Sequence, residues 1–355
     1  MTKEDITALY LGKSYEIVKE IDSSRGDDDV RRVYIAKSAD GGRKVVIHEV
    51  VNTFTDKHRI ASWARLEDEY NKLGIYCPRT VRGLDGNISY AFDADGGTHY
   101  VYAEEFAPYD TVETIGYDTF KMPDGRLSYQ DDMMRSVGRV AEAHLDVCDF
   151  PSSYCLLEPF CSPDTTDEGT ECAEGFRAFV NAELPEYAEQ TERLLKLFYR
   201  AQDEVRKIYG SLPTSCFQAD LNYSNILIDE GRFKGVIDFN LSGREPILNY
   251  TLRLALNYID SRCYDSDGNE LFYYDEDAES LRVESILRSM SVIGEEYRFT
   301  DAEKRAFPAL LRYMKNFWWG ELGTIKRLKK DGDNEKIELL LNWLERQLTR
   351  NDISL

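Results

Sequence analysis

Clustered cysteines and histidines are scarce in this chain of 355 residues. It contains seven cysteines, spread without a C-x-x-C pair, and four histidines, so a zinc site of Cys and His ligands is not expected. Long apolar runs are missing as well: no stretch approaches the ~20 residues of a membrane-spanning helix, and the N-terminus lacks an apolar secretory core. Scattered thiols without a signal segment predict a reduced, cytoplasmic protein.

Positive charge is also in short supply. The chain has 44 Lys and Arg against 65 Asp and Glu, which gives a formal net charge of −21. Such an acidic surface repels nucleic-acid phosphates and anionic lipids, so we expect neither a nucleic-acid partner nor a membrane partner. Hydrophobic residues still make up 42% and aromatic residues 12%, which is enough for a sizeable core. The length suggests about two domains.

The pattern of apolar residues changes near residue 106. Before it, β-branched and aromatic runs predict strands around one main helix at 60–73, with the clearest strands at 30–36, 44–51, 89–92 and 100–102. After it, apolar residues recur at three- and four-residue steps, which predicts helices. We therefore predict an α+β fold: a lobe at 1–106 with a five-stranded antiparallel sheet, and a larger, mostly helical lobe at 107–355.

One strand signal interrupts the helical half, and residues suited to chemistry surround it. A hairpin is predicted over 225–239 across the turn Glu230-Gly231. Asp220 and Asn225 precede its first strand, and Asp238 follows its second strand. Transfer of a phosphoryl group from a nucleotide needs a carboxylate that receives the proton of the acceptor hydroxyl, and oxygen ligands for Mg²⁺. The alternative is that these Asp and Asn side chains only cap turns.

The segment 217–246 resembles the catalytic core of the aminoglycoside phosphotransferase and choline kinase-like family. The family pattern is H-G-D-x-x-x-x-N, followed about a dozen residues later by an apolar residue and D-F. The resemblance implies a bilobal protein-kinase-like fold that uses ATP or GTP as co-substrate. It implies Asp220 as the catalytic base, and Asn225 and Asp238 as ligands of Mg²⁺.

Two departures from the family pattern stand out. Gln218-Ala219 replaces the family's His-Gly, and glutamine keeps the ability to hydrogen-bond and stabilise the loop. The strand lysine that grips the nucleotide phosphates is also missing, since His48 stands near the expected position. A histidine with a pKa near its reference value of about 6.5 is a weaker phosphate clamp than lysine. A half-buried strand residue without a role is the alternative for His48.

The resemblance places further contacts by position. Expected nucleotide contacts are a phosphate-covering turn (Ser23, Ser24 and Gly26) and a hinge that binds the base (Glu104 and Phe106). A helix carboxylate, Glu67 or Glu69, is expected to pair with the strand residue, and the alternative is a solvated helix charge. Expected acceptor contacts lie near the catalytic loop and the helices beyond it: Asn222, Asn240 and Glu245, with acidic residues such as Asp260 and Glu321. The aromatic pair Trp318-Trp319 is a candidate for a cation–π contact with an amine, and the alternative is that both side chains are packed in the core.

Two functions of different class follow. The first is a Mg²⁺-dependent kinase that phosphorylates a hydroxyl of a small molecule, with a cationic acceptor (an amino alcohol or an aminoglycoside-like sugar) favoured by the acidic chain. The second is a non-catalytic protein of the kinase fold that binds a nucleotide or a metabolite. Its support is the missing strand lysine and the altered Gln218-Ala219.

Overall fold

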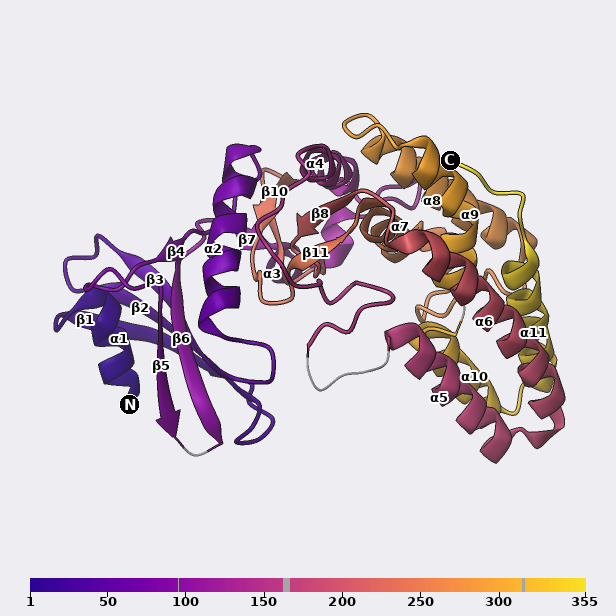
Figure 1. Ribbon diagram of the computed structural model, residues 1–355, viewed down its shortest axis with the longest axis horizontal. Helices are drawn as coiled ribbons and strands as arrows, with labels where there is room; N and C mark the ends of the chain where they lie inside the picture. Colours follow the sequence, from indigo (N-terminus) through magenta and orange to yellow (C-terminus); the bar gives the residue numbers. More distant parts are fainter. Residues whose placement is uncertain (95, 162–166, 315–316) are drawn as a thin grey trace.

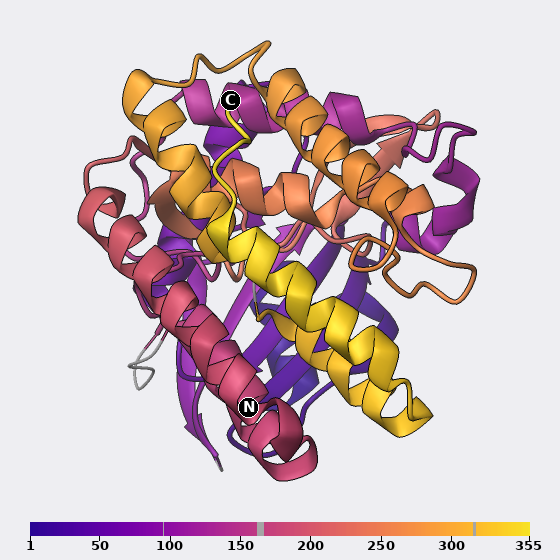
Figure 2. The ribbon, with the colours of Figure 1, turned by 90° about the vertical axis from the view of Figure 1, so that its right-hand side faces the viewer.

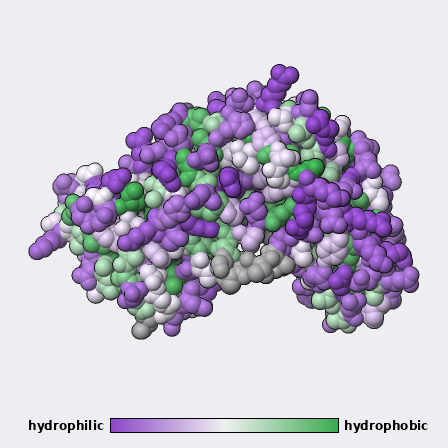
Figure 3. All heavy atoms as spheres, in the orientation of Figure 1, coloured by the Kyte–Doolittle hydropathy of each residue, from purple (hydrophilic) through white to green (hydrophobic). Residues whose placement is uncertain are grey.

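The computed structural model describes residues 1–94, 96–161, 167–314 and 317–355. Figure 1 shows an elongated molecule in which the first strands gather at one end, the long helices gather at the other, and short strands lie between them. This arrangement confirms the predicted α+β class, an antiparallel sheet followed by a mostly helical part. The face drawn in Figure 3 is mainly hydrophilic, as expected when charged residues make up 31% of the chain.

The N-terminal sheet has six strands within the described residues, one more than predicted. The strand order is β1-β2-β3-β6-β4, with β5 beside β6, and all pairs are antiparallel. The bounds are Tyr15–Asp22 (β1), Val30–Ser38 (β2), Lys44–Val51 (β3), Thr80–Val81 (β4), Ser89–Ala94 (β5) and Gly97–Glu105 (β6). Besides the predicted helix, α2 (Lys57–Lys72), the sheet carries α1 (Lys3–Leu11), which the sequence pattern did not reveal.

The two faces of this sheet have different neighbours. Val45 and Ile47 of β3 are buried in a core together with Ile6 of α1. Side chains alternate along a strand, so Val46 and His48 lie on the opposite face. This second face looks toward the rest of the chain, because Val46 and His48 line a cavity that the two parts share.

Helices dominate the remainder of the chain. Among them, α6 packs against α9 and α11, and α4 packs against α8; Figure 2 shows α6 and α11 side by side. Their bounds are Val112–Ile115 (α3), Gln130–Glu142 (α4), Glu168–Glu183 (α5), Ala188–Tyr209 (α6), Ile247–Asn257 (α7), Glu276–Ile293 (α8), Asp301–Met314 (α9), Trp319–Asp331 (α10) and Asn334–Thr349 (α11), with 3₁₀ turns at Tyr117–Phe120, Pro185–Tyr187 and Ser261–Cys263. Within the described ranges, the helices are all too short or too polar to cross a membrane.

The predicted hairpin is confirmed. It consists of β9 (Ile226–Asp229) and β10 (Arg232–Val236), which pair across the turn Glu230-Gly231. Three further short strands complete this region: β7 (Asp110–Thr111) pairs with β9, and β8 (Thr214–Phe217) pairs with β11 (Gly243–Pro246). These strands lie between the sheet and the long helices in Figure 1.

A backbone contact ties the segment after α2 to this hairpin. The Tyr76 N–H donates to the Lys234 carbonyl at 3.2 Å, and the Tyr76 carbonyl accepts from the Val236 N–H at 2.9 Å. Gly235 lies between these two bonds, and a Cβ there would stand 1.7 Å from the Tyr76 oxygen. Only glycine therefore fits at this crossing.

Candidate active site

Gln218 holds the loop between β8 and β9 in place. Its side chain is fully buried, and its Nε2 donates to the carbonyl oxygens of Ile237 at 2.9 Å and Asp238 at 2.6 Å. Its Oε1 accepts from the Asp220 N–H at 2.8 Å. One side chain thus joins the loop that carries Asp220 to the segment that carries Asp238. The expectation that glutamine can hydrogen-bond in place of the family's histidine is confirmed.

The Asp220 carboxylate is held by two amides. Asn225 Nδ2 donates to Asp220 Oδ2 at 2.9 Å, and Asn222 Nδ2 donates to Asp220 Oδ1 at 3.0 Å. Burial raises the pKa of Asp220, and the two amide donors oppose that rise. The predicted acceptor contact Asn222 is thus engaged in orienting Asp220.

The backbone is strained in both of the segments that the Gln218 side chain joins. Ala219 has φ of 54° and Asp238 has φ of 62°, in the left-handed region that disfavours residues other than glycine by ~1–2 kcal/mol. Ala219 occupies the position of the family's glycine. The Gln218 bonds hold the segments on which both strained residues lie.

Asp238 is a half-buried carboxylate that faces the shared cavity. Burial raises its pKa to about 6, and the charge of Asp220 adds to the rise, so the two carboxylates are electrostatic neighbours. Asn240, a predicted acceptor contact, donates its backbone N–H to Asp238 Oδ1 at 3.4 Å. Among the ion pairs of the described residues, none involves Asp238. A cation from solution is therefore a suitable partner for this group.

The donor set suits a hard cation. Asn225 uses its Nδ2 to hold Asp220, which leaves Oδ1 as its free coordinating atom apart from a 3.2 Å contact with Ser224 Oγ. Within the described residues, no group of three or more His, Cys, Asp or Glu could hold a metal. The candidate site is instead mixed, with an amide oxygen and a carboxylate. Oxygen donors of this kind, supplemented by phosphate oxygens and water, are what Mg²⁺ prefers.

A cavity of about 320 Å³ lies between the sheet and the hairpin. Its lining includes both proposed metal ligands and three of the predicted nucleotide contacts: Asn225, Asp238, His48, Glu104 and Phe106. The other predicted nucleotide contacts do not line it. The connection between β1 and β2 contains Ser23, Ser24 and Gly26. Glu67 is a buried residue of α2, with 2% of its surface exposed.

The part of this cavity lined by His48 and Glu104 carries little positive charge. The His48 ring stacks on Tyr102 at 4.7 Å between centroids, and burial lowers the pKa of His48 to about 4, so the imidazole is neutral near pH 7. Its Nε2 lies 3.8 Å from Glu104 Oε1. Glu67 does not pair with His48 as expected, because its carboxylate accepts from the Thr80 N–H and hydroxyl, each at 2.7 Å.

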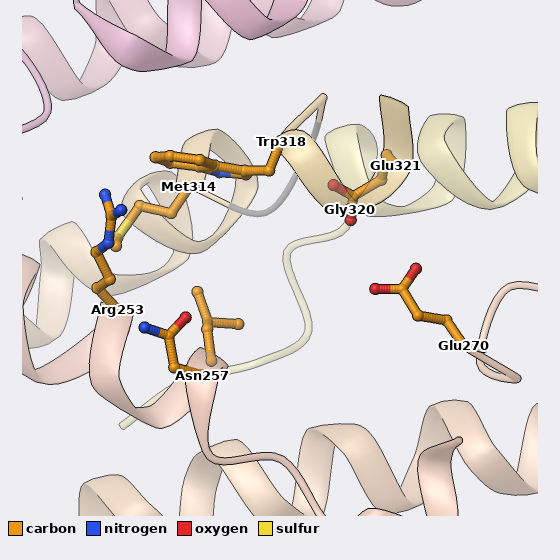
Figure 4. Close-up of a pocket in the computed structure, with 8 residues that line it drawn as sticks. Arg253, Asn257, Glu270, Met314, Trp318, Gly320 and Glu321 are labelled. Carbon is orange, nitrogen blue, oxygen red and sulfur yellow. The ribbon is translucent and has the colours of Figure 1, made fainter. Parts of the chain in front are cut away.

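A second cavity, of about 240 Å³, opens among the helices of the C-terminal part. It is lined by residues of α7, α9 and α10 and of the loop before α8: Arg253, Leu256, Asn257, Glu270, Met314, Trp318, Gly320 and Glu321. Figure 4 shows the Glu270 and Glu321 carboxylates at one end and Arg253 at the other. Because the charge of Arg253 lowers the pKa of Asp220, the Arg253 end is the end nearer the loop that carries Asp220. The side chain of Trp319 lies outside the described residues.

Two other predicted acceptor residues are placed elsewhere. Glu245 is 1% exposed and accepts from Ser152 Oγ and Asn249 Nδ2, each at 2.5 Å. Asp260 pairs with Arg262 at 2.6 Å. Neither residue belongs to the lining of the two cavities. Arg253 and Glu270 were missed in the sequence, because only the packing of three separate segments brings them to one cavity.

Comparison with known proteins supports the fold. No protein-family model and no curated protein sequence matches the chain. Among solved structures, an aminoglycoside phosphotransferase from Alicyclobacillus acidocaldarius is similar over 98% of this chain and 96% of its own, with a TM-score of 0.50 at 12% identity. An amicoumacin kinase in complex with AMP-PNP and Ca²⁺ follows, with a TM-score of 0.48 at 15% identity over 98% and 93% of the two chains. The first similarity shows that this chain has the bilobal, protein-kinase-like fold of an aminoglycoside phosphotransferase.

Proposed function

We propose that this chain is a kinase that transfers the γ-phosphate of ATP or GTP to a hydroxyl group of a small molecule. The observation that carries the proposal is the meeting of Asn225 and Asp238 in the wall of one cavity, with Asp220 held by Asn225 at 2.9 Å. The fold of a known aminoglycoside phosphotransferase supports it. In this proposal residues 1–106 cover the nucleotide in the cytoplasm, and residues 107–355 carry the catalytic groups and the acceptor site.

Asp220 is the proposed general base. Burial raises its pKa, which makes it a better proton acceptor, while Asn222 and Asn225 orient it. It takes the proton of the acceptor hydroxyl as the hydroxyl oxygen bonds to the γ-phosphorus, and the bond from that phosphorus to the bridging oxygen breaks to release ADP or GDP. Asn225 and Asp238 would hold Mg²⁺, which supplies neutralisation of the phosphate charge when bound.

The proposed acceptor is a small molecule that carries an amine beside its hydroxyl, such as an amino alcohol or an aminoglycoside-like sugar. The second cavity supports this choice, since Glu270 and Glu321 lie at one end and Arg253 lies toward the Asp220 loop. An ammonium group near two carboxylates gains charge-assisted hydrogen bonds. The solved relative with the same fold is named for phosphotransfer to aminoglycosides.

A non-catalytic protein that binds a nucleotide or a metabolite is the second candidate, because His48 contributes no charge to the phosphates. Phosphate transfer to hydroxylated amines and neutral sugars, with Mg²⁺ and ATP or GTP, separates the two. Asp220→Asn should abolish transfer but keep nucleotide binding, whereas Asp238→Ala should also weaken Mg²⁺-dependent binding. Asp229→Asn, on the exposed end of the hairpin, is the matched control. Binding of nucleotide without transfer to any acceptor would favour the second candidate.

A further inference from the structure

The nucleotide cavity lacks a cation where the proposed function needs one. A triphosphate is strongly anionic, and protein cations usually share its charge with the metal. The described residues that line the cavity include no Lys or Arg, but three carboxylates belong to the lining: Glu104, Glu105 and Asp238. His48 is neutral. The inference below rests on the proposed function and asks which residue supplies the missing charge.

The strand register places one arginine on the face of the sheet that carries His48. Val33 of β2 lies opposite His48 of β3, and Arg31 lies opposite Val50. Residues two apart share a face, and directly paired residues share it too. Arg31 therefore projects from the same face as His48, at the diagonal position ~7–8 Å from it between Cα atoms, a span that an arginine side chain can reach across.

Of the other cations on this face, Lys19 of β1 lies opposite Ile35 and is therefore one strand farther from His48 than Arg31 of β2, and two more lie at the opposite end of the strands. Lys44 of β3 has its Nζ 3.3 Å from the centre of the Phe106 ring, and Lys37 of β2, which lies opposite Lys44, pairs with Glu16 at 2.9 Å. Both are at the end where β6 leaves the sheet toward Phe106. Arg31 lies at the other end, beside the predicted phosphate-covering turn.

Arg31 is connected to that turn by hydrogen bonds of its backbone and its side chain. Its backbone N–H donates to Ser24 Oγ at 3.0 Å, and its carbonyl accepts from the Ser23 N–H at 3.0 Å. Its guanidinium forms a two-bond pair with the Asp29 carboxylate, at 2.6 Å and 2.9 Å.

We propose that Arg31 binds the terminal phosphates of the nucleotide and so replaces the lysine that is missing from β3. Carboxylate and phosphate offer the guanidinium the same arrangement of two acceptor oxygens. Asp29 therefore holds Arg31 in its binding orientation and is displaced when a phosphate arrives. The side chain is 44% exposed in this pair, so the exchange requires no unfolding of the strand.

Calorimetric titration of the full chain with Mg²⁺-ATP, Mg²⁺-ADP and adenosine tests the proposal. Arg31→Gln should weaken ATP binding about tenfold or more, which is the size of one charge-assisted hydrogen-bonded contact, and should leave adenosine binding unchanged. Lys37→Gln removes one charge from the same strand and should change neither ATP binding nor adenosine binding. If the wild type prefers ATP over adenosine and Arg31→Gln keeps that preference, the inference is wrong. If the wild type shows no preference, the proposed function fails as well.

A second variant predicts a gain of affinity, which loss of folding cannot imitate. Asp29→Asn removes the competitor of the phosphate, so it should tighten ATP binding several-fold in the wild-type background. In the Arg31→Gln background it should have no more effect than Asp27→Asn, which removes the same charge from the same turn. Equal gains with and without Arg31 would mean that the turn acts only through its total charge, and would overturn the proposal.

Discussion

Gln218→Leu is the most direct test of how the loop that carries Asp220 is held. The side chain is fully buried, and leucine has a similar size without donors or acceptors. The change leaves three backbone groups unpaired: the Asp220 N–H and the carbonyls of Ile237 and Asp238. A buried unpaired polar group costs ~1–3 kcal/mol. Taking the lower value, because water can enter beside the cavity, we expect a loss of about 3 kcal/mol in the free energy of unfolding.

Urea denaturation and nucleotide titration measure the two consequences. The strained backbone at Ala219 and Asp238 should relax once the Gln218 bonds are lost, so Mg²⁺-dependent ATP binding should weaken together with stability. Gln202→Leu is the matched control: Gln202 is 6% exposed and donates to Thr170 and Tyr313 in the helical part. It should cost stability but leave nucleotide affinity unchanged. Unchanged stability and binding in Gln218→Leu would refute the reasoning.

Three further outcomes are expected. Gly235→Ala should lower the free energy of unfolding by about 2 kcal/mol or more in urea denaturation, because its Cβ would stand 1.7 Å from the Tyr76 oxygen; a neutral effect would show that this crossing can widen. Burial raises the pKa of Glu67 above its ordinary value of 4.5, so its contribution to stability is complete below that pH and is lost as the pH rises through the raised pKa. Glu67→Gln should therefore reduce the fall in stability between about pH 5 and pH 9, and an unchanged pH profile would contradict this. Glu270→Gln should raise KM for an amine-bearing acceptor about tenfold with little effect on a neutral one, measured by steady-state kinetics; an equal change for both acceptors would exclude an ammonium contact.

The parts of the fold that the sequence predicted are those with a strong local pattern. The β-branched runs of β2 and β3 and the turn Glu230-Gly231 carry their structure in neighbouring residues. β4 and β7 have two residues each, too few for any periodicity, and they form because longer strands offer them partners. The helix α1 has apolar residues on more than one side, so its pattern is weak.

The candidate site divides in the same way. Asp220, Asn225 and Asp238 were predicted because one short hairpin connects them. Glu245 looked available as a polar residue near the loop, but its carboxylate is buried against Ser152, which comes from a segment far away in the sequence. Arg31 was overlooked because its face of the sheet depends on the pairing of β2 with β3, which composition does not reveal.

The contact between Tyr76 and β10 affects how the cavity between the sheet and the hairpin can open. Two backbone hydrogen bonds fasten the segment after α2 to the hairpin that leads to Asp238, and the Tyr70 hydroxyl of α2 accepts from the Gln218 N–H at 3.0 Å. In mechanical terms, α2 belongs with the β9–β10 hairpin although it precedes residue 106 in the chain. Because β1, β2 and β3 are hydrogen-bonded to β6 in one sheet, a movement that admits the nucleotide would carry these strands together with the sheet, relative to α2. Arg31 would travel with the moving strands and meet the phosphates as they close.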